Sequence, residues 1–133
     1  MIKCFEIFTP IVRGNLDAIE ELARRFVEGQ AKQNVIYTEV RYSPHLLAEG
    51  GSFSGTEKVD PRPVIAAVTR GLRAGCEACG VTVNQILCCI TWRPDWAEEV
   101  VDLASELKDS PGICKVVGVD IAAGEVRDIG DES

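Results

Sequence analysis

The spacing of apolar residues changes repeatedly along the chain between a helical pattern and a strand pattern. Apolar positions three and four residues apart predict helices over about 15–33, 60–80 and 95–110, each with one face turned toward a core. In the first helix this face comprises Ile19, Leu22, Ala23, Phe26 and Val27. The expected helix boundaries are N-caps at Asn15, Asp60 and Asp95 and a C-cap at Gly80.

Between these helices lie runs of β-branched, aromatic and other apolar residues, which predict strands over 35–43, 81–91 and 113–121. Pro44 ends the first strand because proline has no N–H to donate to a neighbouring strand. The second half of the middle strand is continuously apolar, as expected for a strand buried on both faces. Helices alternating with such strands predict an α/β fold of parallel β/α units with right-handed crossovers.

Composition and charge narrow the class of protein. The 133 residues are 46% hydrophobic and 26% charged, which is typical of one globular domain or a piece of a larger one. The net charge is −7 and the chain has no lysine and arginine cluster, so nucleic acids and anionic membrane surfaces are not expected partners. The chain shows neither a secretory signal nor a membrane-spanning apolar run, and we therefore expect a cytoplasmic protein with reduced thiols.

Polar side chains gather where the predicted strands end, which is the edge where α/β folds place their chemistry. The three groups are Arg41, Ser43 and His45; Thr91, Trp92 and Arg93; and Asp120 and Glu125. Each group also has a structural interpretation. Arg41 could pair with Glu39 on the same strand, His45 could anchor a loop, and Asp120 could cap a turn.

The residues of the chain argue against a catalytic zinc site and against a redox-active cysteine pair. A catalytic zinc site needs about three protein ligands, usually including several histidines, and this chain has one histidine. Cys76 and Cys79 have the spacing of a redox pair, but they lie at a predicted helix C-terminus, where the helix dipole opposes a thiolate. A structural interpretation of that pair is therefore favoured.

Three segments together resemble the adenosine deaminase family: residues 37–48 (Y-T-E-V-R-Y-S-P-H-L-L-A), 86–96 (I-L-C-C-I-T-W-R-P-D-W) and 116–122 (V-V-G-V-D-I-A). The resemblance implies a partial TIM-type (β/α)8 barrel over residues 1–125, carrying barrel strands two to four. Residues 126–133 then form a polar, acidic tail.

The resemblance also implies a chemistry, namely zinc-dependent hydrolysis of adenosine to inosine and ammonia. The family's zinc ligands and proton-shuttling glutamate belong to segments other than this chain, so neither catalytic nor metal-binding residues are assigned here. What carries over is substrate contact, with Leu46 and Ile90 on the nucleoside pocket wall and Ala123 and Gly124 near a purine nitrogen. Ala123 stands where the family has glycine.

The leading hypothesis is therefore a fragment of an adenosine deaminase that binds no catalytic zinc and deaminates nothing by itself. The alternatives are a non-catalytic binding or regulatory module of the same family, and a small α/β domain with redox cysteines. A piece of a barrel exposes strand edges and an inner face, which we expect to be apolar. Self-association through these exposed edges is expected.

Overall fold

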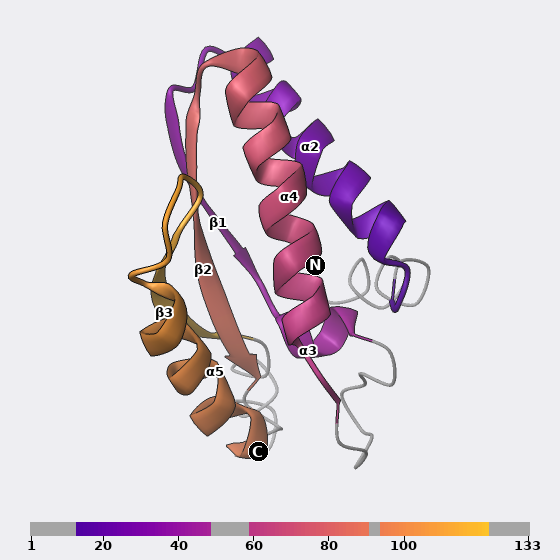
Figure 1. Cartoon of the computed structure of the whole chain (residues 1–133), viewed down its shortest axis with the longest axis vertical. Coiled ribbons are helices and arrows are strands. Elements are labelled where there is room, and N and C mark those ends of the chain that lie inside the picture. Colours follow the sequence, from indigo (N-terminus) through magenta and orange to yellow (C-terminus); the bar gives the residue numbers. More distant parts are fainter. Residues whose placement is uncertain (1–12, 49–58, 91–93, 123–133) are drawn as a thin grey trace, which may run out of the picture.

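The computed structural model of the protein describes residues 13–48, 59–90 and 94–122 (Figure 1). The predicted tail over residues 126–133 lies outside the described residues. The elements, in chain order, are α2 (Leu16–Lys32), β1 (Tyr37–Tyr42), α3 (Pro44–Leu47), α4 (Arg62–Cys79), β2 (Thr82–Ile90), α5 (Pro94–Leu107) and β3 (Val116–Ala122). Helices and strands thus alternate as the sequence predicts, with the short α3 added directly after β1.

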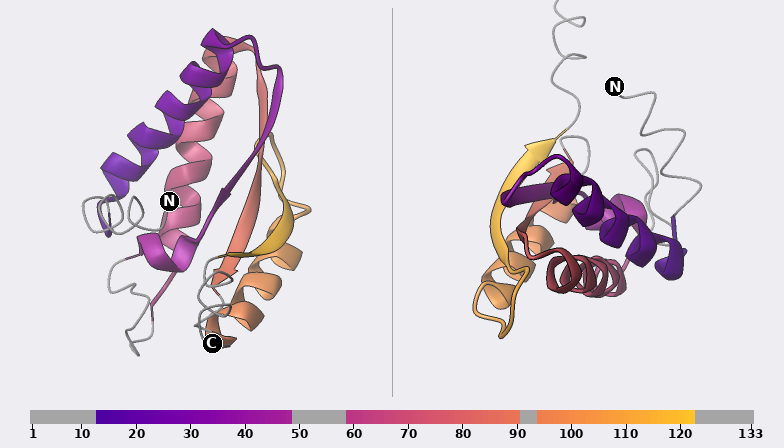
Figure 2. Two further views of the ribbon diagram at one scale, coloured as in Figure 1. Left: turned by 180° about the vertical axis from the view of Figure 1, so that it is seen from behind. Right: turned by 90° about the horizontal axis from the view of Figure 1, so that it is seen from above.

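The three strands form one parallel sheet in the order β1-β2-β3, with helices packed on one of its faces (Figure 2). Tyr37 pairs with Thr82 at the start of β1, and the register continues without interruption to Tyr42. Between β2 and β3 the register shifts at Gln85 and Ile86, which marks a bulge. The predicted parallel β/α architecture is confirmed, and the arrangement is that of consecutive units of a TIM-type barrel.

The helix boundaries lie close to the caps predicted from the sequence, but only Asn15 and Gly80 are caps themselves: Pro61 caps α4, and Asp95 lies in the first turn of α5. The Asn15 side chain accepts a hydrogen bond from the Ala18 N–H at 3.1 Å, and Gly80 ends α4 with a φ of 75°. Asp60 accepts from the Arg62 N–H at 3.1 Å, one residue ahead of the Pro61 that caps α4. One expectation was wrong: Leu22 is 53% exposed, because α2 packs mainly along α4 and the core-facing side of α2 is narrower than the apolar pattern.

Two glycines of α4 allow it to approach α2 closely. A Cβ built at Gly71 would lie 2.2 Å from the Glu20 carbonyl oxygen, and one at Gly75 would lie 2.6 Å from the Val27 Cβ. Both distances are too short for any other residue without movement of the helices. The largest apolar cluster forms around this contact and includes Ile19, Val27, Val64, Val68 and Leu72.

The face of the sheet under the helices contains a buried glutamine whose hydrogen bonds are all internal. Gln85 donates from Nε2 to the Thr69 hydroxyl at 2.9 Å and to the Cys114 carbonyl at 2.7 Å. Its Oε1 accepts from the Tyr42 hydroxyl at 2.6 Å, and burial raises the pKa of that phenol. The network joins β1, β2, α4 and the start of β3 without leaving a polar group of Gln85 unpaired.

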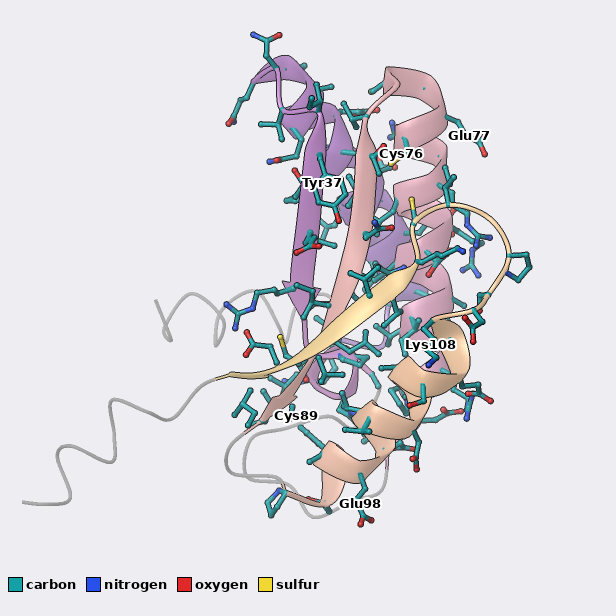
Figure 3. The ribbon with its side chains drawn as sticks, turned by 90° about the vertical axis from the view of Figure 1, so that its left-hand side faces the viewer. Tyr37, Cys76, Glu77, Cys89, Glu98 and Lys108 are labelled. Carbon is teal, nitrogen blue, oxygen red and sulfur yellow. The ribbon has the colours of Figure 1, made fainter. Side chains whose placement is uncertain are left out.

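The opposite face of the sheet is not covered by the described helices and carries both polar and apolar side chains, and Figure 3 looks onto it with α2 and α4 behind the strands. Alternation along the strands places Tyr37, Glu39 and Arg41 of β1 on this side. Asn84 and Asp120 lie beside them, on β2 and β3. The expectation of an apolar inner face is met only in part, because the same alternation also places the apolar residues Ile86, Cys88 and Ile90 of β2 on this side.

Apolar exposure is concentrated instead on β3, at one edge of the sheet. Val119 is 46% exposed and Ile121 is 62% exposed. The register pairs them with Leu87 and Cys89, so they lie on the helix-bearing side of the sheet, beyond the part that α5 covers.

Within the described residues, no helix has the length and apolar character needed to cross a membrane.

Candidate functional site at the carboxyl edge of the sheet

The carboxyl ends of the three parallel strands meet at one edge of the sheet, and a tight turn follows β1 there (Figure 1). Ser43 caps the short helix α3 by accepting a hydrogen bond from the Leu46 N–H at 3.3 Å, and Pro44 occupies its first turn. The Leu46 carbonyl accepts from Arg13 Nε at 2.9 Å. Leu46 is thus held at its N–H by the Ser43 side chain and at its carbonyl by Arg13, in the segment before α2.

The structure brings together the two described residues that were predicted to line a nucleoside pocket. Leu46 follows β1 and Ile90 ends β2, and both are buried in one apolar cluster with Trp96 of α5. Parallel strands explain the meeting, because neighbouring strands deliver their last residues to the same edge. Their role as substrate contacts stays a prediction.

His45 anchors this cluster to α5. Its ring is fully buried and lies nearly parallel to Trp96, with ring centroids 4.9 Å apart and an interplanar angle of 17°. Nε2 lies 2.7 Å from a carboxylate oxygen of Glu99 and donates to it, since a carboxylate only accepts. The structure therefore agrees with the interpretation of His45 as an anchor, and the anchored turn is the one that carries Leu46.

Arg41 has a different partner from the one considered in the sequence. Its guanidinium pairs with Asp120 of β3 at 2.8 Å, whereas Glu39 accepts a hydrogen bond from the Tyr37 hydroxyl. Hydrogen bonding to the Cys88 thiol beside the ion pair raises the pKa of Arg41, and burial raises the pKa of Cys88. Asp120 also accepts from the Ile121 N–H at 2.7 Å, but both residues lie within β3, so the interpretation of Asp120 as a turn cap is not supported.

The remaining predicted site residues lie outside the described part of the chain. These are Thr91, Trp92, Arg93, Ala123, Gly124 and Glu125. The sequence interpretation missed Glu99 as the partner of His45. The available signal was its spacing of three residues from Trp96, which places both on one side of α5.

The described residues do not fit a catalytic zinc ion. Among them no group of three or more histidine, cysteine, aspartate or glutamate side chains is placed to hold a metal. His45, the single histidine of the chain, is buried between Trp96 and Glu99. No step through zinc is therefore assigned to these side chains.

Cys76 contacts a different cysteine from the one that the sequence spacing suggested, which was Cys79. Cys76 is buried with its Sγ atom 3.6 Å from that of Cys114, while Cys79 is exposed.

A cavity of about 330 Å³ lies nearby, between α4 and α5, away from the carboxyl edge of the sheet. Its walls include Arg62, Arg73, Gln85, Leu103 and Cys114.

Comparisons with known proteins agree on one family. The family model described as adenosine deaminase matches residues 1–130. The adenosine deaminase of Mus musculus is 38% identical over 133 residues, covering 91% of this chain and 35% of the relative. That of Danio rerio is 37% identical over 127 residues, with 91% and 34% covered. The chain thus spans about a third of the length of the curated relatives it matches.

A solved structure supports the fold. The crystal structure of an amidohydrolase from Burkholderia ambifaria, with bound zinc, superposes with a TM-score of 0.70 at 20% sequence identity. The match covers 91% of this chain and 32% of the other. At that identity the similarity concerns the fold alone.

Proposed function

The chain belongs to the adenosine deaminase family, and from this premise we propose that it supplies barrel strands two to four of a zinc-dependent enzyme that hydrolyses adenosine to inosine and ammonia. One observation carries the proposal. Relatives named adenosine deaminase match 91% of this chain, and the match is about a third of their own length. An enzyme containing this segment would need further β/α units.

Within such an enzyme, we assign the carboxyl edge of this chain to substrate binding. Leu46 and Ile90 would form part of the apolar wall against the nucleoside, supported from behind by Trp96. His45 would act as a positioning residue, because it ties the turn bearing Leu46 to Glu99 of α5. By the family resemblance, Ala123 and Gly124 would lie near the purine ring.

Zinc would be bound by residues other than those described here. This inference rests on the single, internally bonded histidine and on the lack of a ligand cluster among the described side chains. We therefore propose that the 133-residue chain alone does not deaminate adenosine. Adenosine is the proposed small-molecule partner, and the cytoplasmic location and the lack of nucleic-acid or membrane partners stay predictions.

The activity is tested with two purified proteins: this chain, and a longer protein that contains it together with the family's histidine-bearing segments. Both are incubated with zinc and adenosine, and inosine is measured by chromatography. We expect product from the longer protein only. Zinc-dependent inosine from the chain alone would overturn its proposed inactivity, and an inactive but folded, zinc-loaded longer protein would favour the non-catalytic module.

The pocket wall is tested in the longer protein by truncating one side chain at a time. Ile90→Ala is expected to raise KM for adenosine about tenfold, because a buried apolar contact with substrate is worth about 1–3 kcal/mol. Leu103→Ala is the matched control, since Leu103 is equally buried but belongs to the cluster under α5. An equal change in KM for both variants would contradict the assignment of Ile90.

Self-association of the isolated chain is proposed to run through β3, where Val119 and Ile121 are exposed at a sheet edge. Sedimentation velocity should show concentration-dependent species larger than the monomer. Ile121→Lys should shift the distribution toward monomer, whereas Val101→Lys, at an equally apolar exposed site on α5, should not. A monomer at all concentrations would contradict the proposal.

A further inference from the structure

Two buried thiols from distant parts of the chain lie almost in bonding range. The Sγ atoms of Cys76 and Cys114 are 3.6 Å apart, although the residues are separated by 38 positions in the sequence. A disulfide requires a separation of about 2.05 Å, so the sulfur atoms need to approach by roughly 1.5 Å. Cys76 is on the last turns of α4, and Cys114 precedes β3.

The segment that carries Cys114 is held firmly against α4. Arg73 donates from Nε to the Ile113 carbonyl and from Nη2 to the Pro111 carbonyl, both at 3.0 Å. The Cys114 carbonyl accepts from the buried Gln85 amide at 2.7 Å. Cys114 itself has a φ of 61°, a left-handed conformation that a non-glycine residue adopts when its surroundings impose it. The approach of the two thiols is therefore enforced by several independent hydrogen bonds.

We propose that Cys76 and Cys114 are an oxidisable pair that forms a disulfide in exchange with a small-molecule disulfide such as oxidised glutathione. One protein thiolate attacks the small disulfide and displaces one small thiolate. The second protein thiolate then attacks the protein sulfur of this mixed disulfide and displaces the other small thiol. The pair loses two electrons and two protons, and the small disulfide is reduced to two thiols.

The environment of the pair predicts slow but stable oxidation. Burial, together with the adjacent Cys76 thiol, raises the pKa of Cys114 to about 12, so little thiolate is present at neutral pH. Exchange should accelerate as the pH rises, because the thiolate is the attacking species. Once formed, the bond joins α4 to the start of β3 and closes a loop that contains the last residues of α4, all of β2 and all of α5, which restricts the unfolded chain.

This pair differs from the one that sequence spacing suggests. Cys79 lies three residues after Cys76, but it is exposed at the end of α4, whereas Cys114 is the thiol in contact with Cys76. Cys79→Ser is therefore a matched control for Cys114→Ser: each removes one thiol near Cys76, and only the second removes the proposed partner.

The test uses the whole chain, folded and incubated with oxidised glutathione at mildly alkaline pH. Remaining thiols are alkylated, and the protein is digested without reduction by trypsin and a glutamyl endopeptidase. Cleavage after Glu77 separates Cys76 from Cys79, so mass spectrometry distinguishes their partners. We expect the Cys76–Cys114 linkage to dominate in the natural chain and in Cys79→Ser, and to be absent from Cys114→Ser. The oxidised chain should melt roughly 10 °C above the reduced chain.

Three results would overturn the proposal. These are a dominant Cys76–Cys79 linkage, statistical pairing among the six cysteines, and the same yield of the Cys76–Cys114 linkage when the chain is oxidised in concentrated urea. The mapping in the natural chain does not depend on any variant folding correctly. It also needs no deaminase activity, so its outcome is independent of the proposed function.

Discussion

The two faces of the sheet differ in how their side chains are buried and hydrogen-bonded. The helix-covered face buries Val83 and Leu87, together with a glutamine whose hydrogen bonds are all made inside the protein. The open face carries Glu39 and the Arg41–Asp120 ion pair, which bond to neighbours on the sheet and remain accessible to water. The covered face should therefore account for most of the stability of the isolated chain. Substitutions on the open face should change the free energy of unfolding little.

Adjacent residues of β2 provide the sharpest test of this difference. Leu87 is fully buried against α5, whereas its neighbour Ile86 lies on the open face and is partly exposed. Leu87→Ala should lower the free energy of unfolding by about 4 kcal/mol, because it removes a buried side chain and leaves a cavity. Ile86→Ala should cost about 1 kcal/mol. Urea unfolding followed by circular dichroism measures both, and equal losses would show that the open face is also packed.

The helix layer behind the covered face should be almost as sensitive. Gly71→Ala places a methyl group against the Glu20 carbonyl oxygen and should destabilise the chain by about 3 kcal/mol. Gly29→Ala is the control, since its new methyl group would have no atom within 4 Å. This second change, within α2, should stabilise by about 0.5–1 kcal/mol. A shift of the urea midpoint in the same direction for Gly71→Ala and Gly29→Ala would contradict this prediction.

A smaller effect is expected from the buried polar network. Tyr42→Phe keeps the ring but removes the hydroxyl that donates to Gln85, leaving a buried amide oxygen without that donor. The loss should be about 1–3 kcal/mol, the usual penalty for an unsatisfied buried group. Phe in place of Tyr37, whose hydroxyl is on the open face, should change the unfolding free energy by less than about 0.5 kcal/mol. Thermal melts of the two variants should thus separate clearly.

The smallest effect should come from the Arg41–Asp120 ion pair. Its side chains are 53% and 46% exposed, so a double-mutant cycle in this chain should give a coupling below about 1 kcal/mol that declines with added salt. In a longer protein where the same face lines a closed barrel, the coupling should be larger, because water no longer screens the charges. Equal couplings in both proteins would indicate that this face stays solvated.

Local features were predictable from the sequence because they depend on backbone conformation and periodicity. Asn15 and Gly80 mark helix ends by their hydrogen bonding and φ preference, and the uninterrupted apolar run ending at Ile90 indicated a strand, although the described helices cover only one of its faces (Figure 2). The family resemblance likewise rested on contiguous segments, and the comparisons confirmed it. The outlier was Leu22, whose spacing fits the core face but whose side chain lies beyond the reach of α4.

Pairings across the fold were decided by the tertiary structure. Sequence proximity suggested Glu39 for Arg41 and Cys79 for Cys76, yet the partners are Asp120 and Cys114. His45 could be identified as an anchor, but its partner Glu99 depends on how α5 docks against the end of β1.

The sequence by itself thus determined which segments become helices and strands, their parallel order and the family. Only the packing of the sheet against its helices decided which side chains meet and which face remains open to water. The physical reason is that local hydrogen bonding and hydrophobic periodicity act over a few residues, whereas contacts between distant residues depend on the register of the strands and the docking of the helices.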